Sequence, residues 1–159
     1  MNIQIIKETH HEHKQYINDQ LYKFNLAHFP EDLRGRYEQV HFTLLDEDGR
    51  VRGGILGEVC WNWLEIHTLM VDEEIRSFGF GSKLLTEVEL LAVNRKCDFI
   101  KVDTLSFQAL EFYEKHGYKV FGQLDNVGRH FTHYYLKKDL LKHSLFSKTL
   151  LHLIQLEAN

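Results

Sequence analysis

The stretch that decides the fold is residues 64–94, which read LEIHTLMV, DEEI, RSFGFG and SKLLTEVELLAVN in succession. Its first segment (64–71) predicts a β-strand, whose side chains point alternately to the two faces of a sheet. One face takes Leu64, Ile66, Thr68 and Met70, and the other takes Glu65, His67, Leu69 and Val71. The last segment predicts an amphipathic helix, because its apolar residues recur at helical spacing: Leu84, Leu85, Val88, Leu91 and Ala92.

Two glycines, Gly79 and Gly81, stand where this helix begins. The first N–H groups of a helix have no partner within it and lie at its positive dipole end. Because a glycine lets a ligand approach the backbone closely, we expect an anion site suited to phosphate. A P-loop needs Gly-Lys-Ser/Thr, whereas the order here is Gly81-Ser82-Lys83. A dinucleotide fingerprint needs a third glycine, where this chain has Leu84. A turn without a ligand explains the two glycines equally well.

Length and composition indicate one globular domain with its own core, since the chain has 159 residues and 43% of them are hydrophobic. The formal net charge is −4 and no long basic run is present, so nucleic acid is not an expected partner. We find no signal-peptide pattern and no run of the roughly 20 apolar residues that span a bilayer. Cys60 and Cys97 form no Cys-x-x-Cys pair, so we expect a reduced, cytoplasmic protein without a zinc site or disulfide framework.

The N-terminal region predicts a strand over 2–7 and then a helix. The helix starts at a capping box of Thr9 and Glu12 and ends before Pro30. Three histidines at this start, His10, His11 and His13, indicate a solvated surface and not a metal site, since only the first and third share a helix face.

On both sides of the central stretch the pattern is one of strands and turns. Asp46 to Gly49 predicts a hairpin turn between strands over 40–45 and 51–60. The second strand contains Gly53, Gly54 and Gly57, which indicate a bulge or the close approach of another group. Later elements are a strand over 99–104, parallel to the central strand, a helix capped by Ser106 and stopped at Gly117, and strands over 118–123 and 131–137.

Two blocks of this sequence carry a family resemblance. The first is Arg76-x-x-Gly79-x-Gly81, and the core of the second is Ala109, Phe112, Tyr113, Gly117 and Tyr118. In this order, with a helix and a strand between them, they resemble the coenzyme A pyrophosphate loop and the second conserved block of the GCN5-related N-acetyltransferase (GNAT) superfamily. The resemblance covers about residues 2–138. It implies an α/β (mixed α+β) fold, in which helices flank a central mixed, mostly antiparallel sheet with a splayed parallel strand pair.

The resemblance also implies acetyl-CoA as cosubstrate and an N-acetyltransferase domain over 1–138. The phosphates of coenzyme A are expected on the loop residues Arg76, Ser77, Phe78, Gly79, Phe80, Gly81 and Ser82. Its amide-rich pantetheine arm is expected to pair like an added strand with the main chain of Leu69, Met70 and Val71. The second block adds Ala109, Phe112 and Tyr113 to the expected cofactor-binding set. No metal ion is expected.

Tyr113 matches the position of the family's tyrosine general acid. An unperturbed tyrosine has a pKa near 10, so it stays protonated at neutral pH and can protonate the thiolate that leaves. A backbone N–H of the central strand is expected to polarise the carbonyl oxygen. No covalent enzyme intermediate is required, so Cys60 and Cys97 are not proposed as nucleophiles.

The amine must be neutral when it attacks, which calls for a group that takes its proton. Glu65 and His67 are the candidates, since they share the predicted strand face of Leu69. Glu58 on the preceding strand and Asp103 on the following one are alternatives. Some members of the family need no dedicated base.

The predicted activity is transfer of an acetyl group to a primary amine by direct attack in a ternary complex. The acidic balance favours a cationic acceptor, such as a polyamine, an aminoglycoside, an amino acid or a protein amine. Transfer of another acyl group is one alternative. A non-catalytic acyl-CoA-binding or partner-interaction module is another, against which the retained Tyr113 argues.

Residues 139–159 predict a C-terminal helical extension with a broad apolar surface. It has three conceivable uses: packing on its own domain, joining a second subunit in a homodimer, or lying on a membrane. The first two are favoured, because the polar face carries few basic groups.

Overall fold

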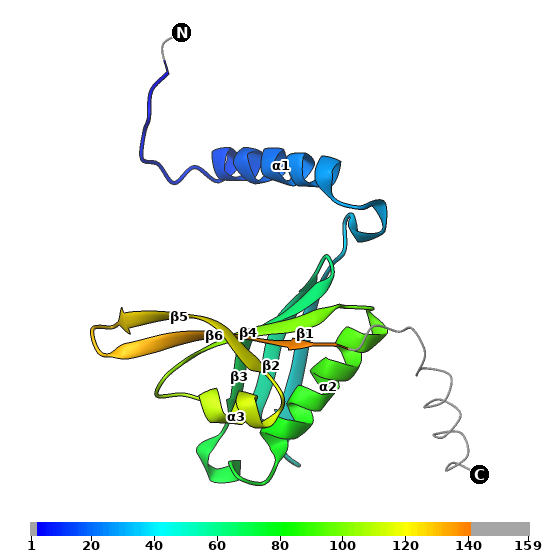
Figure 1. Ribbon diagram of the computed structural model, residues 1–159, viewed down its shortest axis with the longest axis vertical. Helices are drawn as coiled ribbons and strands as arrows, with labels where there is room; N and C mark the ends of the chain where they lie inside the picture. The colour runs from blue at the N-terminus through cyan, green and yellow to red at the C-terminus, as the bar shows by residue number, and fades with distance from the viewer. Residues whose placement is uncertain (1–2, 141–159) are drawn as a thin grey trace, which may run out of the picture. The chain divides into compact units, whose positions relative to one another are not determined.

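The computed structural model describes residues 3–140, which divide into two units at Gly35 and Arg36. The N-terminal unit contains helix α1 (His11–His28) and the short 3₁₀ turn η1 (Glu31–Leu33). The second unit contains the sheet and its helices (Figure 1). The predicted C-terminal helix over 139–159 lies outside the described residues, except that Asp139 ends a strand and the Leu140 N–H donates to the Asp98 carbonyl at 2.8 Å.

In the N-terminal unit, residues 3–10 contain no strand, so the predicted strand over 2–7 is wrong for the part that is described. Alternating apolar residues make a strand only where a neighbouring strand pairs with them, and none does so here. Helix α1 begins after His10 without a side-chain cap, so the capping box of Thr9 and Glu12 does not form. The predicted end before Pro30 is confirmed.

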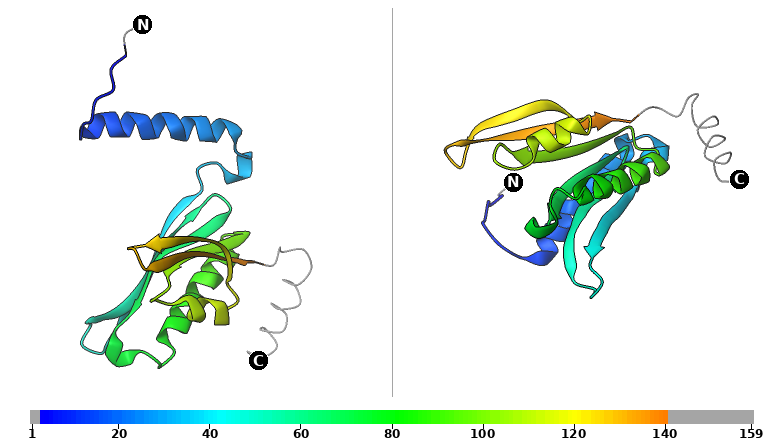
Figure 2. Two further views of the ribbon diagram at one scale, coloured as in Figure 1. Left: turned by 60° about the vertical axis from the view of Figure 1, so that its left-hand side comes forward. Right: turned by 90° about the horizontal axis from the view of Figure 1, so that it is seen from below.

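The second unit forms one six-stranded sheet in the order β1-β2-β3-β4-β6-β5. Its strands are β1 (Tyr37–Leu45), β2 (Val51–Cys60), β3 (Trp63–Val71), β4 (Phe99–Leu105), β5 (Lys119–Val127) and β6 (Phe131–Asp139). Strands β3 and β4 are parallel, and the other neighbours are antiparallel. The sheet twists, so that β5 and β6 turn away from β1 and β2 (Figure 2). The predicted fold class, a mixed and mostly antiparallel sheet with helices, is confirmed.

The β1–β2 hairpin follows the sequence prediction closely. Gly49 has a φ of +77°, and the Asp46 carboxylate accepts the backbone N–H groups of Asp48 and Arg50 at 3.1 and 2.8 Å. In β2, a Cβ atom on Gly57 would stand 2.3 Å from the carbonyl oxygen of Glu65. The predicted close approach at the β2 glycines is confirmed, because no side chain fits between these two strands.

A β-bulge interrupts β3 at His67. Leu56 of β2 lies opposite Thr68, and the next residue, Gly57, lies opposite Ile66, so His67 is the extra residue. A bulge reverses the alternation of side chains that follow it. Leu64 and Ile66 are buried, as predicted, but beyond the bulge the residues that pack on the core are Leu69 and Val71.

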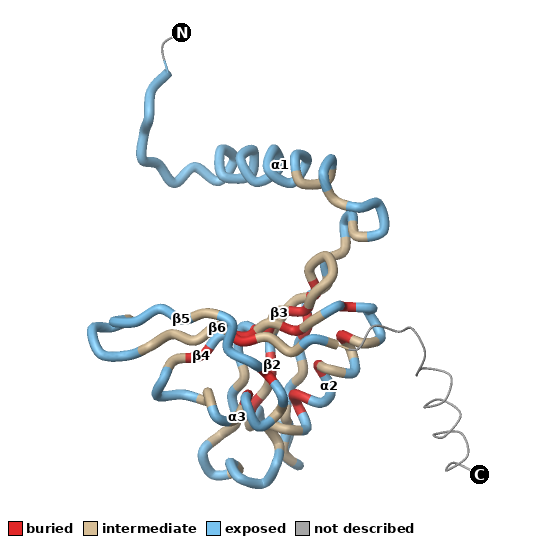
Figure 3. The backbone as a smooth tube through the Cα atoms, viewed as in Figure 1, coloured by how far each residue is buried: buried red, intermediate tan, exposed pale blue. Residues whose placement is uncertain are grey.

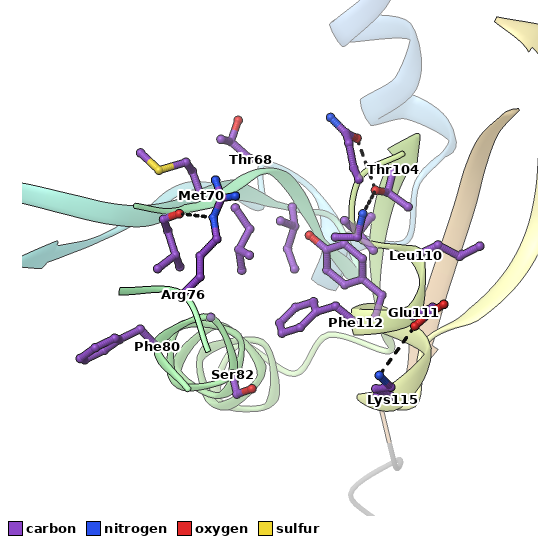
Figure 4. A pocket seen from close by; sticks show the side chains of 18 of the residues that line it. Thr68, Met70, Arg76, Phe80, Ser82, Thr104, Leu110, Glu111, Phe112 and Lys115 are labelled. Carbon is purple, nitrogen blue, oxygen red and sulfur yellow. Dashed lines mark hydrogen bonds and ion pairs between the residues drawn. The ribbon is translucent and has the colours of Figure 1, made fainter. Parts of the chain in front are cut away.

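The predicted faces of β3 are therefore wrong beyond Ile66. Thr68 and Met70 are exposed and point away from the helix that carries Ser82 (Figure 4). The prediction assumed an unbroken period of two residues.

The core lies between the sheet and α2 (Phe80–Asn94). Four α2 residues are buried: Leu84, Leu85, Val88 and Ala92. They pack with apolar residues of the central strands, and the buried segments in Figure 3 gather where α2 faces the sheet. Helix α3 (Leu110–Lys115) covers the end of β4 beside α2. Among the helices of residues 3–140, none is long and apolar enough to cross a membrane.

Candidate active site

Strands β3 and β4 part in the middle of the sheet. They pair only from Trp63 and Phe99 to Ile66 and Val102, and beyond these residues they separate. The separation opens into a cleft of about 1200 Å³, which is lined by β3 residues 66–71, by most of the loop and helix residues 75–82, and by most of residues 102–115 (Figure 4). The expected splay of the parallel strand pair is present as this cleft, and the apex of the cleft lies where β3 and β4 stop pairing.

The loop from β3 to α2 forms one side of the cleft. After the turn η2 (Glu73–Ile75), the Arg76 guanidinium reaches back, and its Nε donates to the Val71 carbonyl at 3.0 Å (Figure 4). Gly79 has a φ of +82° and starts α2 without a side-chain cap. The N–H groups of the first helical turn therefore have no partner within the helix, an arrangement that suits an anion. A Cβ atom on Gly79 would meet nothing within 4 Å, so the backbone there is open to a ligand.

His116 ties the first turn of α2 to the end of α3. Its Nδ1 lies 2.7 Å from the Phe112 carbonyl oxygen and its Nε2 lies 2.9 Å from the Ser82 hydroxyl. Because a carbonyl only accepts, Nδ1 carries a proton, and in the neutral ring Nε2 accepts from Ser82. His116 was not predicted as a site residue from the sequence, since a lone histidine before a glycine matches no site pattern.

Tyr113 lies on α3 with its side chain buried, and it lines the cleft. Burial, together with the smaller effect of the negative charge of Asp103, raises the pKa of Tyr113 to about 12. The phenol therefore keeps its proton at neutral pH. The turn before α3 is held by Thr104, whose hydroxyl accepts the Ala109 N–H at 3.2 Å. The predicted cap Ser106 instead accepts the Thr132 N–H from β6 at 3.2 Å.

The candidate bases occupy different surroundings. Glu65 accepts from the Lys101 ammonium at 2.7 Å and does not line the cleft. His67 lines the cleft, and its Nε2 lies 3.7 Å from the Glu58 carboxylate, which is outside the lining. Asp103 lines the cleft and accepts from the His133 ring at 2.6 Å.

Comparison with known proteins places this geometry in a family. The model of the acetyltransferase (GNAT) family matches residues 5–118. The chain belongs to this family. Acetyltransferase Atu2258 of Agrobacterium fabrum is 32% identical over 124 residues, which are 78% of this chain and 88% of that protein. The blasticidin-S acetyltransferase of Streptomyces morookaense is 35% identical over 95 residues, 59% of this chain and 70% of that protein.

A solved structure agrees with this assignment. The crystal structure of an acetyltransferase from Bacillus cereus superposes with a TM-score of 0.80 at 31% identity and covers 86% of this chain and 98% of its own. The resemblance to the GNAT superfamily is confirmed, and the activity class of the chain is N-acetyltransferase.

Within this GNAT chain, most of the residues singled out from sequence come together at the cleft. All of the expected cofactor-binding residues line it except Phe78, which is 71% exposed. Of the three expected catalytic residues, Tyr113 and His67 line it and Glu65 does not. Burial raises the pKa of the Cys60 and Cys97 thiols, and neither lines the cleft, which fits their exclusion as nucleophiles.

Proposed function

We propose that this GNAT protein transfers the acetyl group of acetyl-CoA to a primary amine by direct attack in a ternary complex. The observation that carries the proposal is the shared cleft of Tyr113 and the glycine loop at the parting of β3 and β4. One end of such a site holds a polyanion, and the other presents a protonated phenol.

The residues present fit acetyl-CoA. The free amides at the start of α2, from Gly79 to Ser82, suit its pyrophosphate. Residues 67–71 of β3 have no pairing with β4, so their main chain on that side is available to the amides of a pantetheine arm. Arg76, through its bond to the Val71 carbonyl, holds the loop that joins these two parts.

The reaction itself needs few groups from the protein. A backbone N–H of β3 polarises the thioester carbonyl, a group at the apex takes the proton of the amine, and Tyr113 protonates the sulfur as it leaves. His67 lies at that apex, directly after the last residue of β3 that pairs with β4. Because Glu65 is paired with Lys101 away from the cleft, His67 is the better placed of the two bases first considered.

The acceptor is a small amine. The relative from Streptomyces morookaense is named for blasticidin S, so blasticidin S is the first compound in the panel of acceptors. The formal net charge of −4 favours amines that are cationic at neutral pH, which puts polyamines and aminoglycosides next in the panel.

The test is calorimetric titration of the purified protein with acetyl-CoA, followed by an assay of thiol release with the panel of amines. Binding together with amine-dependent thiol release supports the proposal. Binding without thiol release from any amine supports instead a non-catalytic acyl-CoA-binding module. Absence of binding contradicts the proposal at its first step.

A further inference from the structure

Two polar residues flank the apex of the cleft. His67 follows Ile66 on β3 and Asp103 follows Val102 on β4, and Ile66 and Val102 are the last pair that the two strands form. Both polar side chains line the cleft. Asp103 is thus the first residue of β4 that is free of β3, at the apex of the cleft.

A second residue holds the Asp103 carboxylate. On the neighbouring strand β6, Tyr135 lies directly opposite Asp103, and His133 lies two residues before it on the same face. His133 Nε2 is 2.6 Å from Asp103 Oδ2, and the Tyr135 hydroxyl is 3.4 Å from His133 Nδ1. With Asp103 ionised, the neutral ring donates from Nε2 and accepts at Nδ1.

This arrangement leaves Asp103 able to bind a ligand. The bond to His133 uses Oδ2, and among residues 3–140 no hydrogen bond is made to Oδ1. The Asp103 side chain is 41% exposed to solvent, whereas the His133 side chain is 25% exposed. His133 therefore fixes the orientation of the Asp103 carboxylate through Oδ2, and Oδ1 stays accessible to a ligand.

The other acidic residues near the apex are less suited to an amine. The Glu65 carboxylate is neutralised by Lys101, and Glu58 is outside the cleft. Glu111 lines the cleft, but it lies on the exposed side of α3, 3.8 Å from Lys115. His67 carries no negative charge to attract a cation.

Asp103 also acts on the group at the other side of the reaction. Its negative charge disfavours ionisation of the Tyr113 phenol and so raises the pKa of Tyr113, after the larger effect of burial. Asp103 and Tyr113 therefore lie on one cleft, close enough for the charge of the carboxylate to act on the phenol.

We propose that Asp103, oriented by His133, is the acceptor site of this enzyme: it binds a primary amine in its ammonium form and takes the proton that the amine must lose. The inference rests on the proposed function and adds the residues that bind the amine and take its proton.

In the first step, the ammonium nitrogen gives one proton to the Asp103–His133 pair, and the pair later passes this proton to water. The neutral nitrogen then attacks the carbonyl carbon, the C–N bond forms and the C–S bond breaks. A second proton leaves the nitrogen for water or the same pair. The thiolate receives one proton from Tyr113, and solvent then returns a proton to the Tyr113 phenolate. The products are an amide, a free thiol and one net proton.

The test compares Asp103→Asn with Asp139→Asn, a matched removal of a carboxylate at the other end of the same β4–β6 pair. The acceptor is the amine of the panel that the wild type turns over fastest. For Asp103→Asn we expect the Kd for acetyl-CoA within twofold of wild type and kcat/KM for the amine lowered about 100-fold, the scale of a lost general base. Asp139→Asn should match the wild type in both measurements.

A second pair of substrates isolates the role of charge. Hydroxylamine is mostly neutral at pH 7.5, whereas ethylamine is a cation, so the ratio of their kcat/KM values reports recognition of the ammonium group. Asp103→Asn should shift this ratio at least tenfold towards hydroxylamine. His133→Leu, which leaves the carboxylate in place without its hydrogen-bond donor, should lower kcat about tenfold with a smaller change in the ratio.

The outcomes separate the inference from the proposed function. A wild type that acetylates no amine contradicts both. An active wild type with Asp103→Asn at near wild-type kcat/KM and an unchanged ratio overturns the inference alone, and His67→Gln then shows whether His67 is the base. Circular dichroism checks that each variant is folded. If Asp103→Asn does not fold, Asp103→Glu, which keeps the charge, replaces it and should keep the wild-type ratio of ethylamine to hydroxylamine. A tenfold shift of that ratio towards hydroxylamine in Asp103→Glu would also overturn the inference.

Discussion

The two sides of the cleft are built differently. The loop wall, residues 71–82, presents backbone: free amides at the start of α2 and an unpaired strand edge next to it. The opposite wall, residues 102–113, presents side chains, among them Asp103 and Tyr113. The first wall recognises an anion through groups that every residue has, and the second performs chemistry that only particular residues can.

This difference has a consequence for substitution. On the loop wall a side chain matters chiefly because it can block the ligand, so a change there should alter binding of the acetyl donor. On the opposite wall a functional group matters by what it donates or accepts, so a change there should alter turnover. Four variants test this division, beginning with the largest effect.

Tyr113→Phe should have the largest effect. It removes only the phenolic oxygen, so the packing against Phe112 and Tyr118 is kept, with ring centroids 5.3 and 5.6 Å away. We expect kcat to fall by about 1000-fold, within the range of general acid catalysis, and the Kd for acetyl-CoA to stay within twofold. Steady-state kinetics and calorimetry on the same preparation measure the two. The matched control is Tyr118→Phe, a buried tyrosine outside the cleft lining, and a comparable loss of kcat there would contradict the assignment of Tyr113.

Gly81→Asp changes the loop wall and should alter the affinity for acetyl-CoA. Like charges about 4 Å apart repel by about 4 kcal/mol near a protein surface, so the affinity for acetyl-CoA should fall at least roughly 100-fold.

Gly81→Ala is the matched control for this change, because its Cβ would lie at an ordinary 3.5 Å from the Phe112 ring. Calorimetry should give it a Kd within a few-fold of wild type. If both variants lost affinity equally, crowding and not charge would explain the effect, and the amide-built anion site would lose its support.

The contrast between the walls also explains what could be predicted from sequence. The loop wall depends on two glycines before an amphipathic helix, a local pattern, and the structure has the helix where it was expected, with Gly79 and Gly81 at its start. Tyr113 was found because it lies in a second local pattern. The hairpin at Asp46 to Gly49 was predicted for the same reason, since a turn is specified by its own residues.

What the sequence did not reveal depends on contacts between distant residues. The bulge at His67 follows from the pairing of β3 with Gly57 of β2, which no local period reports. His116 meets Ser82 and His133 meets Asp103 across separations of 34 and 30 residues. The strand expected over 2–7 failed for a related reason, because pairing partners are not written in the segment itself.

His116→Leu should have a moderate effect on the loop wall. It removes two hydrogen bonds, each worth about 1 kcal/mol, and frees both Ser82 and the first turn of α2. We expect the affinity for acetyl-CoA to fall roughly fivefold, with kcat nearly unchanged, and the Tm to fall by several degrees. His130→Leu, an exposed histidine in the β5–β6 turn, is the control. A fall in kcat with unchanged affinity for acetyl-CoA would contradict the assignment of His116 to the loop wall.

The smallest effect concerns the pKa of Tyr113. Burial is the main cause of its rise to about 12, and the charge of Asp103 is the lesser one. A negative charge disfavours the phenolate, so Asp103→Asn should lower the pKa of Tyr113, while burial should still hold it above the ordinary value near 10. NMR of ζ-carbon-labelled tyrosine, titrated from about pH 9 to about pH 13 so that the range brackets a pKa of about 12 and assigned by Tyr113→Phe, measures the shift. Asp139→Asn should leave the titration unchanged. A pKa that did not move in Asp103→Asn would mean that the two side chains of this wall do not sense each other, and the acid and the base would then have to be argued separately.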